Sequence, residues 1–383
     1  MTVLSRGELR QLIDKPLETS VSLYMPTERT GDTRQNSTRL KNLLREAEGK
    51  LAEAGIAADE AEGLTKPLQN LLSDDVFWQH QADGFAAFSS RSMFRTYRLP
   101  LEVPQLVLVS QRFHIKPLVS FFSHDVLFYV LALSQNSVRL LQCTRDSVRE
   151  VTPEALPRSL AEALRYDDPE RQLQFHTGTG MGKGKRSAIF HGHAVGTDDK
   201  KENISRFLRQ VDRGIRDVLR EEQAPLVVAG VDYLNSLYRQ ANTYANLTGA
   251  ALEGNFDDSS AQELQRQAWD RVIRPHLDEQ LGQAVSRYYE LGGTDLSTQD
   301  IKEIIVAAHD GRVAELFVAT GTQVWGSYHA ARRSVHLHKV REPDDEDLLD
   351  LAAAQTLLGR GTVYAMEPES VPNGGVAAAI LRY

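Results

Sequence analysis

The chain has 383 residues, of which 41% are hydrophobic and 25% charged, a composition that predicts two or three globular domains with a sizeable buried core. Its formal net charge of −8 argues against a general nucleic-acid-coating protein, but it is compatible with RNA contact through a local basic patch. The single cysteine, Cys143, excludes an intrachain disulfide and a cysteine zinc cage, and no run of apolar residues is long enough for a membrane span, so we expect a cytoplasmic protein.

The first 123 residues are predicted to form an α+β domain. A short helix pattern at 5–13 precedes an alternating strand that ends at Pro26. Leucine and alanine residues at helical spacing then predict a long helix over 34–54. The other elements expected here are a helix at 65–72 and strands at 84–89, 93–99 and 105–109.

A middle domain is predicted over 124–261. Strands at 126–133 and 137–143 are joined by a short polar turn, which is typical of a hairpin. The polar stretch 153–172 contains three prolines and is predicted to be an irregular connection. The other elements expected here are a strand at 148–151, a long amphipathic helix at 198–222, a buried strand at 225–231 and a helix at 233–244.

The last domain is predicted over 262–383. Helix and strand patterns alternate along it, which favours a compact α/β sandwich. The expected elements are helices at 260–290, 298–309 and 344–358, and strands at 312–319, 361–366 and 376–383.

The most distinctive segment of the sequence runs from His176 to Arg186. It holds four glycines within seven residues, which disfavours both helix and strand and predicts a flexible loop. The glycines are Gly178, Gly180, Gly182 and Gly184. Three basic side chains of the same segment, Lys183, Lys185 and Arg186, are candidates for contact with RNA phosphates without base reading. From the residues alone, a solvated surface linker with incidental charge is an equal alternative.

Familiar cofactor and metal patterns do not fit this chain. Neither a Walker A loop nor G-x-G-x-x-G can be placed on the glycine segment, because the required positions hold other residues. The pairs His191–His193 and His336–His338 each offer two ligands on one face of a strand, but no third ligand stands at a fixed spacing. No G-x-S-x-G nucleophile elbow is present. We therefore expect no metal and no cofactor.

Taken in order, these features resemble the class-1 peptide chain release factor superfamily of archaea and eukaryotes, in particular its bacterial members, over nearly the whole chain. The strand at 21–26, the helix after it, Asp83–Ala86 and Arg112–His114 are similar to that family's N-terminal domain. The hairpin at 126–143, the glycine loop, the long helix and Leu226–Gly230 are similar to its middle domain. The resemblance implies a ribonuclease-H-like middle domain and a C-terminal domain related to kink-turn RNA-binding ribosomal proteins.

The sequence departs from that family at the residue that carries its chemistry. Release factors hold Gly-Gly-Gln in the loop before the long helix, and the glutamine places a water against the peptidyl-tRNA ester. The equivalent stretch here, Gly178–Arg186, contains neither glutamine nor two adjacent glycines. Because related non-hydrolytic members act in ribosome rescue or hibernation, the resemblance implies a factor that binds the ribosome, through ribosomal RNA or tRNA, in rescue, dormancy or stress.

Two other functions stay open from the sequence. An enzyme, either a peptidyl-tRNA hydrolase with another water-positioning group or a nuclease, would draw on His176, His191 or His193 as general base. An interaction scaffold that binds a protein partner away from the ribosome would suit the net negative charge. Neither a membrane nor DNA is expected as a partner.

Overall fold

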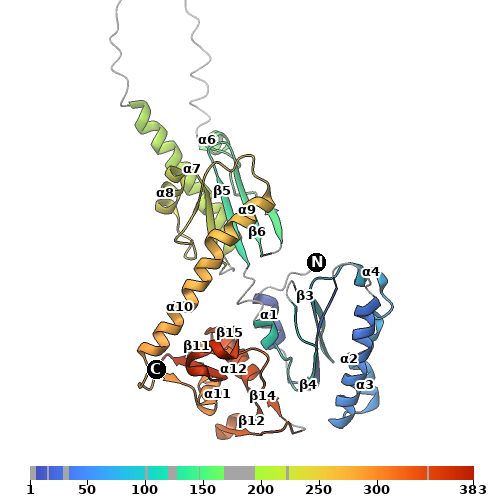
Figure 1. Cartoon of the computed structure of the whole chain (residues 1–383). Coiled ribbons are helices and arrows are strands. Elements are labelled where there is room, and N and C mark those ends of the chain that lie inside the picture. The colour runs from blue at the N-terminus through green and yellow to red at the C-terminus, as the bar shows by residue number, and fades with distance from the viewer. Residues whose placement is uncertain are drawn as a thin grey trace, which may run out of the picture. The chain divides into compact units, whose positions relative to one another are not determined.

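A computed structural model describes residues 6–14, 17–28, 34–99, 102–119, 127–145, 147–167, 195–220, 224–342 and 345–383. The contacts divide the chain into a terminal unit, Met1–His124 with Gln280–Tyr383, and a middle unit, Asp125–Glu279. Among the described residues, helices occur in both units, with three β-sheets in the terminal unit and one in the middle unit, which confirms the predicted mixture of α/β and α+β structure (Figure 1). The division into three domains at 123/124 and 261/262 stays a prediction. Among the described residues, no helix is both long and apolar enough to cross a membrane.

The N-terminal part of the terminal unit is an antiparallel sheet with helices beside it. In chain order its elements are α1 Arg6–Ile13, β1 Ser20–Pro26, α2 Arg34–Glu53, α3 Ala58–Leu71, α4 Asp75–Gln79, β2 Gly84–Ser90, β3 Phe94–Leu99 and β4 Leu106–Ser110. The strand order is β3-β2-β1-β4, and β1 pairs antiparallel with both neighbours. The predicted strands and the long predicted helix are therefore present within a residue or two, as the hydrophobic periods indicated.

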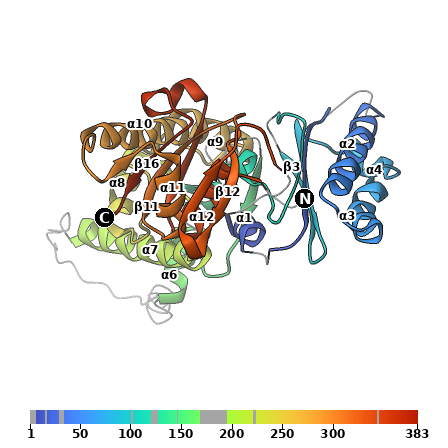
Figure 2. The same ribbon diagram turned by 90° about the horizontal axis from the view of Figure 1, so that it is seen from below.

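The central strand β1 is buried on both faces. Its alternating side chains send Val21, Leu23 and Met25 into a core shared with the leucines of α2 and α3, which cover that face (Figure 2). Tyr24 points the other way, into a core that also contains α12 residues such as Leu348. The N-terminal sheet therefore contributes to two hydrophobic layers.

The C-terminal part of the terminal unit contains two sheets. Its elements are β10 Ser297–Thr298, α11 Ile301–His309, β11 Val313–Ala319, β12 Trp325–His329, β13 Ser334–Leu337, β14 Glu346–Asp347, α12 Leu348–Leu358, β15 Thr362–Met366 and β16 Ala377–Leu381, with short 3-10 helices at Ala330–Arg332, Pro368–Ser370 and Pro372–Gly374. One sheet has the order β10-β16-β11-β15 and the other β13-β12-β14. Apart from Asp350, Gln355 and Thr356, helix α12 is apolar, and most of its residues are buried, as a helix enclosed by protein requires.

The middle unit is built on a single mixed sheet with helices on both faces. Its elements are β5 Phe128–Leu133, β6 Val138–Cys143, β7 Val148–Val151, α6 Leu160–Asp167, α7 Val195–Leu219, β8 Leu226–Gly230, α8 Asp232–Ala241, β9 Leu252–Glu253, α9 Ala261–Ala268, a π-helical turn Trp269–Ile273 and α10 Arg274–Glu290, which continues into the terminal unit. The strand order is β7-β6-β5-β8-β9. Strands β7, β6 and β5 pair antiparallel, whereas β5, β8 and β9 run parallel.

One prediction for the middle unit was wrong. The stretch 153–172 was expected to be irregular, but α6 forms within it and packs Ala163 into the core beneath α7. The prolines at 153 and 157 precede the helix, so they do not interrupt it. Ser159 accepts a hydrogen bond from the backbone N–H of Glu162 at 3.2 Å, which is the capping interaction of a helix start.

Candidate nucleic-acid interface

The glycine-rich segment lies outside the described residues, because the structure does not describe 168–194. The predicted residues concerned are His176, Gly178, Gly180, Gly182, Lys183, Gly184, Lys185, Arg186, His191 and His193. Their roles stay predictions. Helix α7 begins at Val195, directly after this range in the sequence, and it is the first described element that follows the segment.

Helix α7 is amphipathic, and its apolar face is buried in the middle unit. Ile204, Phe207, Leu208, Val211, Ile215 and Leu219 are all at most 7% exposed. They pack in one core with Leu131 of β5 and Tyr238 of α8. On this side α7 packs closely against the backbone near Ala155, since a Cβ added at Gly214 would meet the Ala155 carbonyl oxygen at 2.9 Å. The buried face fixes the rotation of α7 about its own axis.

A buried carboxylate anchors α7 to the end of α8. Asp212 is 4% exposed, and its two oxygens accept hydrogen bonds from the backbone N–H and the hydroxyl of Thr243, at 2.9 and 2.6 Å. Hydrogen bonds to both oxygens compensate the burial of this charge. The helix is therefore held by polar as well as apolar contacts.

The exposed face of α7 is rich in arginine. Its members are Arg206, Arg209, Arg213, Arg216 and, one residue beyond the helix, Arg220. The arginines recur at spacings of three and four residues, which is the sequence signal for one face of a helix, and this face was not among the predicted contact residues.

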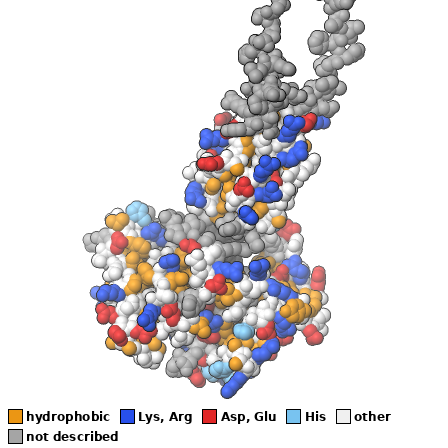
Figure 3. Space-filling model, turned by 180° about the vertical axis from the view of Figure 1, so that it is seen from behind, with side chains coloured by type: hydrophobic (Ala, Val, Ile, Leu, Met, Phe, Trp, Pro, Cys, Tyr) orange, Lys and Arg blue, Asp and Glu red, His pale blue; other side chains and the backbone are white. Residues whose placement is uncertain are grey.

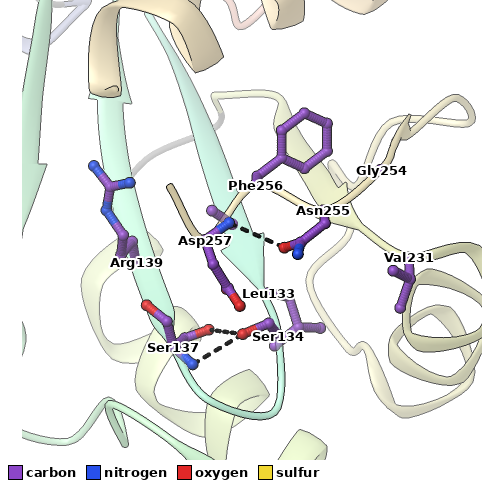
Figure 4. A pocket seen from close by; sticks show the side chains of 10 residues that line it. Leu133, Ser134, Ser137, Arg139, Val231, Gly254, Asn255, Phe256 and Asp257 are labelled. Atoms are coloured by element: carbon purple, nitrogen blue, oxygen red, sulfur yellow. Dashed lines mark hydrogen bonds between the residues drawn. The ribbon is translucent and has the colours of Figure 1, made fainter. Parts of the chain in front are cut away.

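A small pocket lies at the carboxyl ends of the parallel strands β5 and β8 (Figure 4). Such edges are the usual ligand sites of parallel sheets. Here Ser134 and Ser137 close the β5–β6 turn through hydrogen bonds to each other, and Asn255 accepts from the backbone N–H of Asp257 at 3.2 Å. Arg139 is engaged with Glu150 at 3.2 Å and with the Ser259 carbonyl oxygen at 2.9 Å. These polar groups are occupied in holding turns together, and no nucleophile–base pair is formed among them.

The terminal unit contains a cluster of buried charges where residues 112–116 meet 345–350. The Lys116 ammonium, 3% exposed, donates to Asp347 at 2.7 Å and to the carbonyl oxygen of Thr322. One oxygen of Asp350 accepts the backbone N–H groups of Ile115 and Lys116, at 2.7 and 2.6 Å. The cluster joins segments 231 residues apart in the sequence, and every carboxylate in it has a donor, as buried charges require.

His114 and Glu346 complete this cluster. The Nδ1 atom of His114 lies 3.3 Å from Asp350, while its Nε2 atom is buried and has no hydrogen-bond partner among the described groups. Burial raises the pKa of Asp350, and the nearby His114 partly offsets the rise. Burial likewise raises the pKa of Glu346, and its ion pair with Arg112 opposes the shift. Shifted carboxyl groups can mark active sites, but here they hold two chain segments together.

The other candidate ligands are not brought together. His338 lies 2.8 Å from Asp345 through Nδ1, whereas the ring of His336 lies against that of His329, with centroids 5.8 Å apart. In the described part of the chain, no group of three or more His, Cys, Asp or Glu side chains could hold a metal ion. Cys143 is buried, and burial raises its pKa to about 12.

A family model matches most of the middle unit. Residues 128–275 match the model of the bacterial archaeo-eukaryotic release factor family 7, a range that lies within the middle unit. No curated protein matches the chain.

Several solved structures are weakly similar to the whole chain. The archaeal translation termination factor aRF1 is 13% identical, with 99% of each chain covered and a TM-score of 0.23. The match to a model of ribosome-bound archaeal Pelota and ABCE1 is 13% identical, covers 100% of this chain and 95% of that one, and has a TM-score of 0.37. Dom34 of S. cerevisiae, a translation termination-like factor, is 10% identical, with 78% and 80% covered and a TM-score of 0.36. No functional detail transfers at such TM-scores. The match over 128–275 shows that this part of the chain is similar to the bacterial archaeo-eukaryotic release factors, the resemblance that the order of its sequence features predicted.

Proposed function

We propose that this protein binds the ribosome as a release-factor-like factor and does not use Gly-Gly-Gln to hydrolyse peptidyl-tRNA. One observation carries the proposal. The middle unit matches a release-factor-like family, yet the stretch Gly178–Arg186, which the resemblance aligns with the Gly-Gly-Gln loop of release factors, holds no glutamine. A ribosome-binding role in rescue, dormancy or stress follows if the binding surface is kept and the hydrolytic group is absent.

The topology of the middle unit supports this assignment. Three antiparallel strands, β7, β6 and β5, are followed across the sheet by the parallel strands β8 and β9. This order is the one expected for the ribonuclease-H-like fold that the resemblance implies. The sheet also supports α7 on one face, directly after the glycine-rich segment in the sequence.

Local charge supports an RNA partner in spite of the net charge of −8. Basic residues occur both before α7, at Lys183, Lys185 and Arg186, and on its exposed face. Contact with RNA phosphates depends on such local groups, and it weakens as salt rises because counterions compete for the phosphates.

Cosedimentation with ribosomes tests the proposal. The purified chain should pellet with ribosomes at low salt and be released as salt rises, and replacing Lys183, Lys185 and Arg186 together by alanine should weaken the association. A matched control with the same loss of charge is the triple alanine replacement of Lys41, Arg45 and Lys66, which are exposed on α2 and α3 of the terminal unit. Absence of the wild-type protein from the ribosome pellet, with both purified ribosomes and stationary-phase extract, would reject the proposed function.

The hydrolase alternative has its own test. If another group positions the water, the protein should release peptide from a ribosome loaded with peptidyl-tRNA, and His176→Ala should abolish that release. We expect no release above the uncatalysed rate, from either the wild-type protein or this variant.

A further inference from the structure

A row of five exposed arginines runs along α7 and ends one residue beyond it. Its members, which we call the arginine row, are Arg206, Arg209, Arg213, Arg216 and Arg220. We propose that the arginine row binds the phosphate backbone of double-stranded RNA. The inference deepens the proposed function, on which it rests for the source of that RNA, since the ribosome would supply such duplexes.

The helical period places the five guanidinium groups along one line. Successive members are three, four, three and four residues apart, so they occupy an arc of about 80° on the helix. The row is about 21 Å long, at 1.5 Å of rise per residue. Because the opposite face of α7 is buried through residues such as Phe207 and Val211, the row must face outward. Lys and Arg side chains gather along α7 in the surface view (Figure 3).

Among the described residues the row is only partly neutralised, although an exposed acid, Asp217, stands four residues after Arg213 without forming an ion pair within 4 Å. A solvated face commonly alternates in sign, with an acid four residues from each base. Here Arg206 pairs with Glu202 at 2.6 Å, and Arg216 lies 3.8 Å from Asp212, whose oxygens already accept from Thr243.

The remaining three arginines are available to a ligand. Arg209 donates to the carbonyl oxygen of Ser205 at 3.3 Å, and neither it, Arg213 nor Arg220 has a carboxylate partner among the described residues. Exposed ion pairs such as Arg206–Glu202 contribute little to stability, so they can exchange for phosphate contacts. The row therefore concentrates positive charge on a chain in which acids outnumber bases by 52 to 44.

The chemistry of the row favours an RNA duplex over other acidic partners. All five residues are arginine and none is lysine, and the planar guanidinium fork matches phosphate oxygens in pairs. A single strand is bound through aromatic side chains that stack on bases, whereas the aromatic residue of α7, Phe207, is buried on the other face. Arginine also occurs at the centre of protein interfaces, but there it stands beside buried aromatic anchors, and the row supplies none. A straight line of cations suits the stiff, regular phosphate backbone of a duplex. Double-stranded RNA is recognised largely by its shape and by contacts to phosphates and 2′-hydroxyls.

Binding of the full-length chain to a fluorescent RNA duplex tests the inference. Anisotropy should report binding that weakens with salt between about 50 and 200 mM. Replacing Arg209, Arg213 and Arg220 together by glutamine, a good helix former, should weaken binding at least tenfold. It should also lower the slope of log K against log salt by about 2–3, since each lost phosphate contact removes about 0.9. Circular dichroism should show an unchanged helix content.

A control separates the row from net charge alone. Glutamine at Lys41, Arg45 and Lys66 removes the same charge from the terminal unit and should leave duplex binding unchanged. The inference is overturned if the wild-type chain does not bind the duplex, if the arginine variant keeps the wild-type affinity and salt slope, or if the control weakens binding equally. Binding of polyglutamate in place of the duplex would overturn it in favour of an acidic protein partner.

Ribosome cosedimentation of the same proteins tests the proposed function separately. Duplex binding without ribosome association would support the arginine row as an RNA-binding site and exclude the proposed ribosome-binding function. Ribosome association without duplex binding would support the proposed function and exclude RNA-duplex binding by the arginine row.

Discussion

Replacing Lys116 with methionine should destabilise the terminal unit strongly. Methionine keeps most of the length of the apolar stem but removes the ammonium group that lies 2.7 Å from Asp347. Both side chains are almost fully buried, at 3% and 1% exposed. The change therefore leaves the Asp347 carboxylate without its cationic partner in an environment that water cannot reach.

The expected loss is about 3 kcal/mol of unfolding free energy, the lower end of the 3–5 kcal/mol typical of a broken buried pair. The lower end applies because Asp347 keeps two hydrogen bonds, from the backbone N–H groups of Val324 and Leu349, both at 3.1 Å. Adding Asp347→Asn should recover much of the loss, because the buried charge then disappears while an oxygen remains to accept those bonds.

Urea unfolding followed by tryptophan fluorescence measures this effect. Of the three tryptophans, Trp78 and Trp325 lie in the terminal unit, so a Trp269→Phe background confines the signal to it. Arg10→Gln is the control, since the Arg10–Asp14 pair is 59% and 51% exposed and its loss should cost less than about 0.5 kcal/mol. If Lys116→Met were no more destabilising than this control, the reasoning about the buried cluster would be refuted.

Three further predictions concern buried groups. The Cys143 thiol, whose pKa burial raises to about 12, should not react with a thiol reagent at mildly alkaline pH until the protein is unfolded, and full labelling of the native chain would contradict this. Gly230→Ala should lower the unfolding free energy by about 1–3 kcal/mol, because the new Cβ would meet the Leu133 carbonyl oxygen at 2.5 Å. The control Gly249→Ala, with nothing within 4 Å of the new Cβ, should lower it little, and equal urea midpoints for the two variants would refute the clash. Burial raises the pKa of Asp350 in the folded state above its unfolded value of about 4. The contribution of Asp350 to the stability of the fold is therefore greatest below the unfolded pKa and is lost as pH rises through the folded pKa. The free-energy cost of Asp350→Asn should shrink toward neutral pH, and a cost in urea titrations that grows with pH would contradict this.

Local periodicity accounts for the parts of the fold that the sequence predicted well. The long amphipathic helices are examples, because their apolar residues recur every three or four positions: the range 34–54 was expected and α2 spans Arg34–Glu53. The strands β5 and β6 were marked by apolar runs flanking a polar turn. The order of these elements likewise predicted the resemblance to release factors, and the family match over 128–275 agrees with it.

The features that sequence reasoning missed depend on long-range partners or on weak local signals. The sheet of β12, β13 and β14 was not predicted, since its strands are short and half exposed. The pair Lys116–Asp347 spans 231 residues, and nothing local marks either residue as buried. The spacing of the arginine row predicts that its members share one helix face. Charged helix faces are common, however, and only the structure shows which of these arginines pair with acids. The glycine-rich segment stays a prediction from sequence.

The most direct test of the ribosomal role is salt-dependent cosedimentation of the intact protein with ribosomes. The wild-type chain should pellet with ribosomes at low salt, be released progressively as salt rises, and bind less well when Lys183, Lys185 and Arg186 are replaced by alanine. A wild-type protein that stays in the supernatant at every salt concentration would exclude the proposed ribosome-binding role.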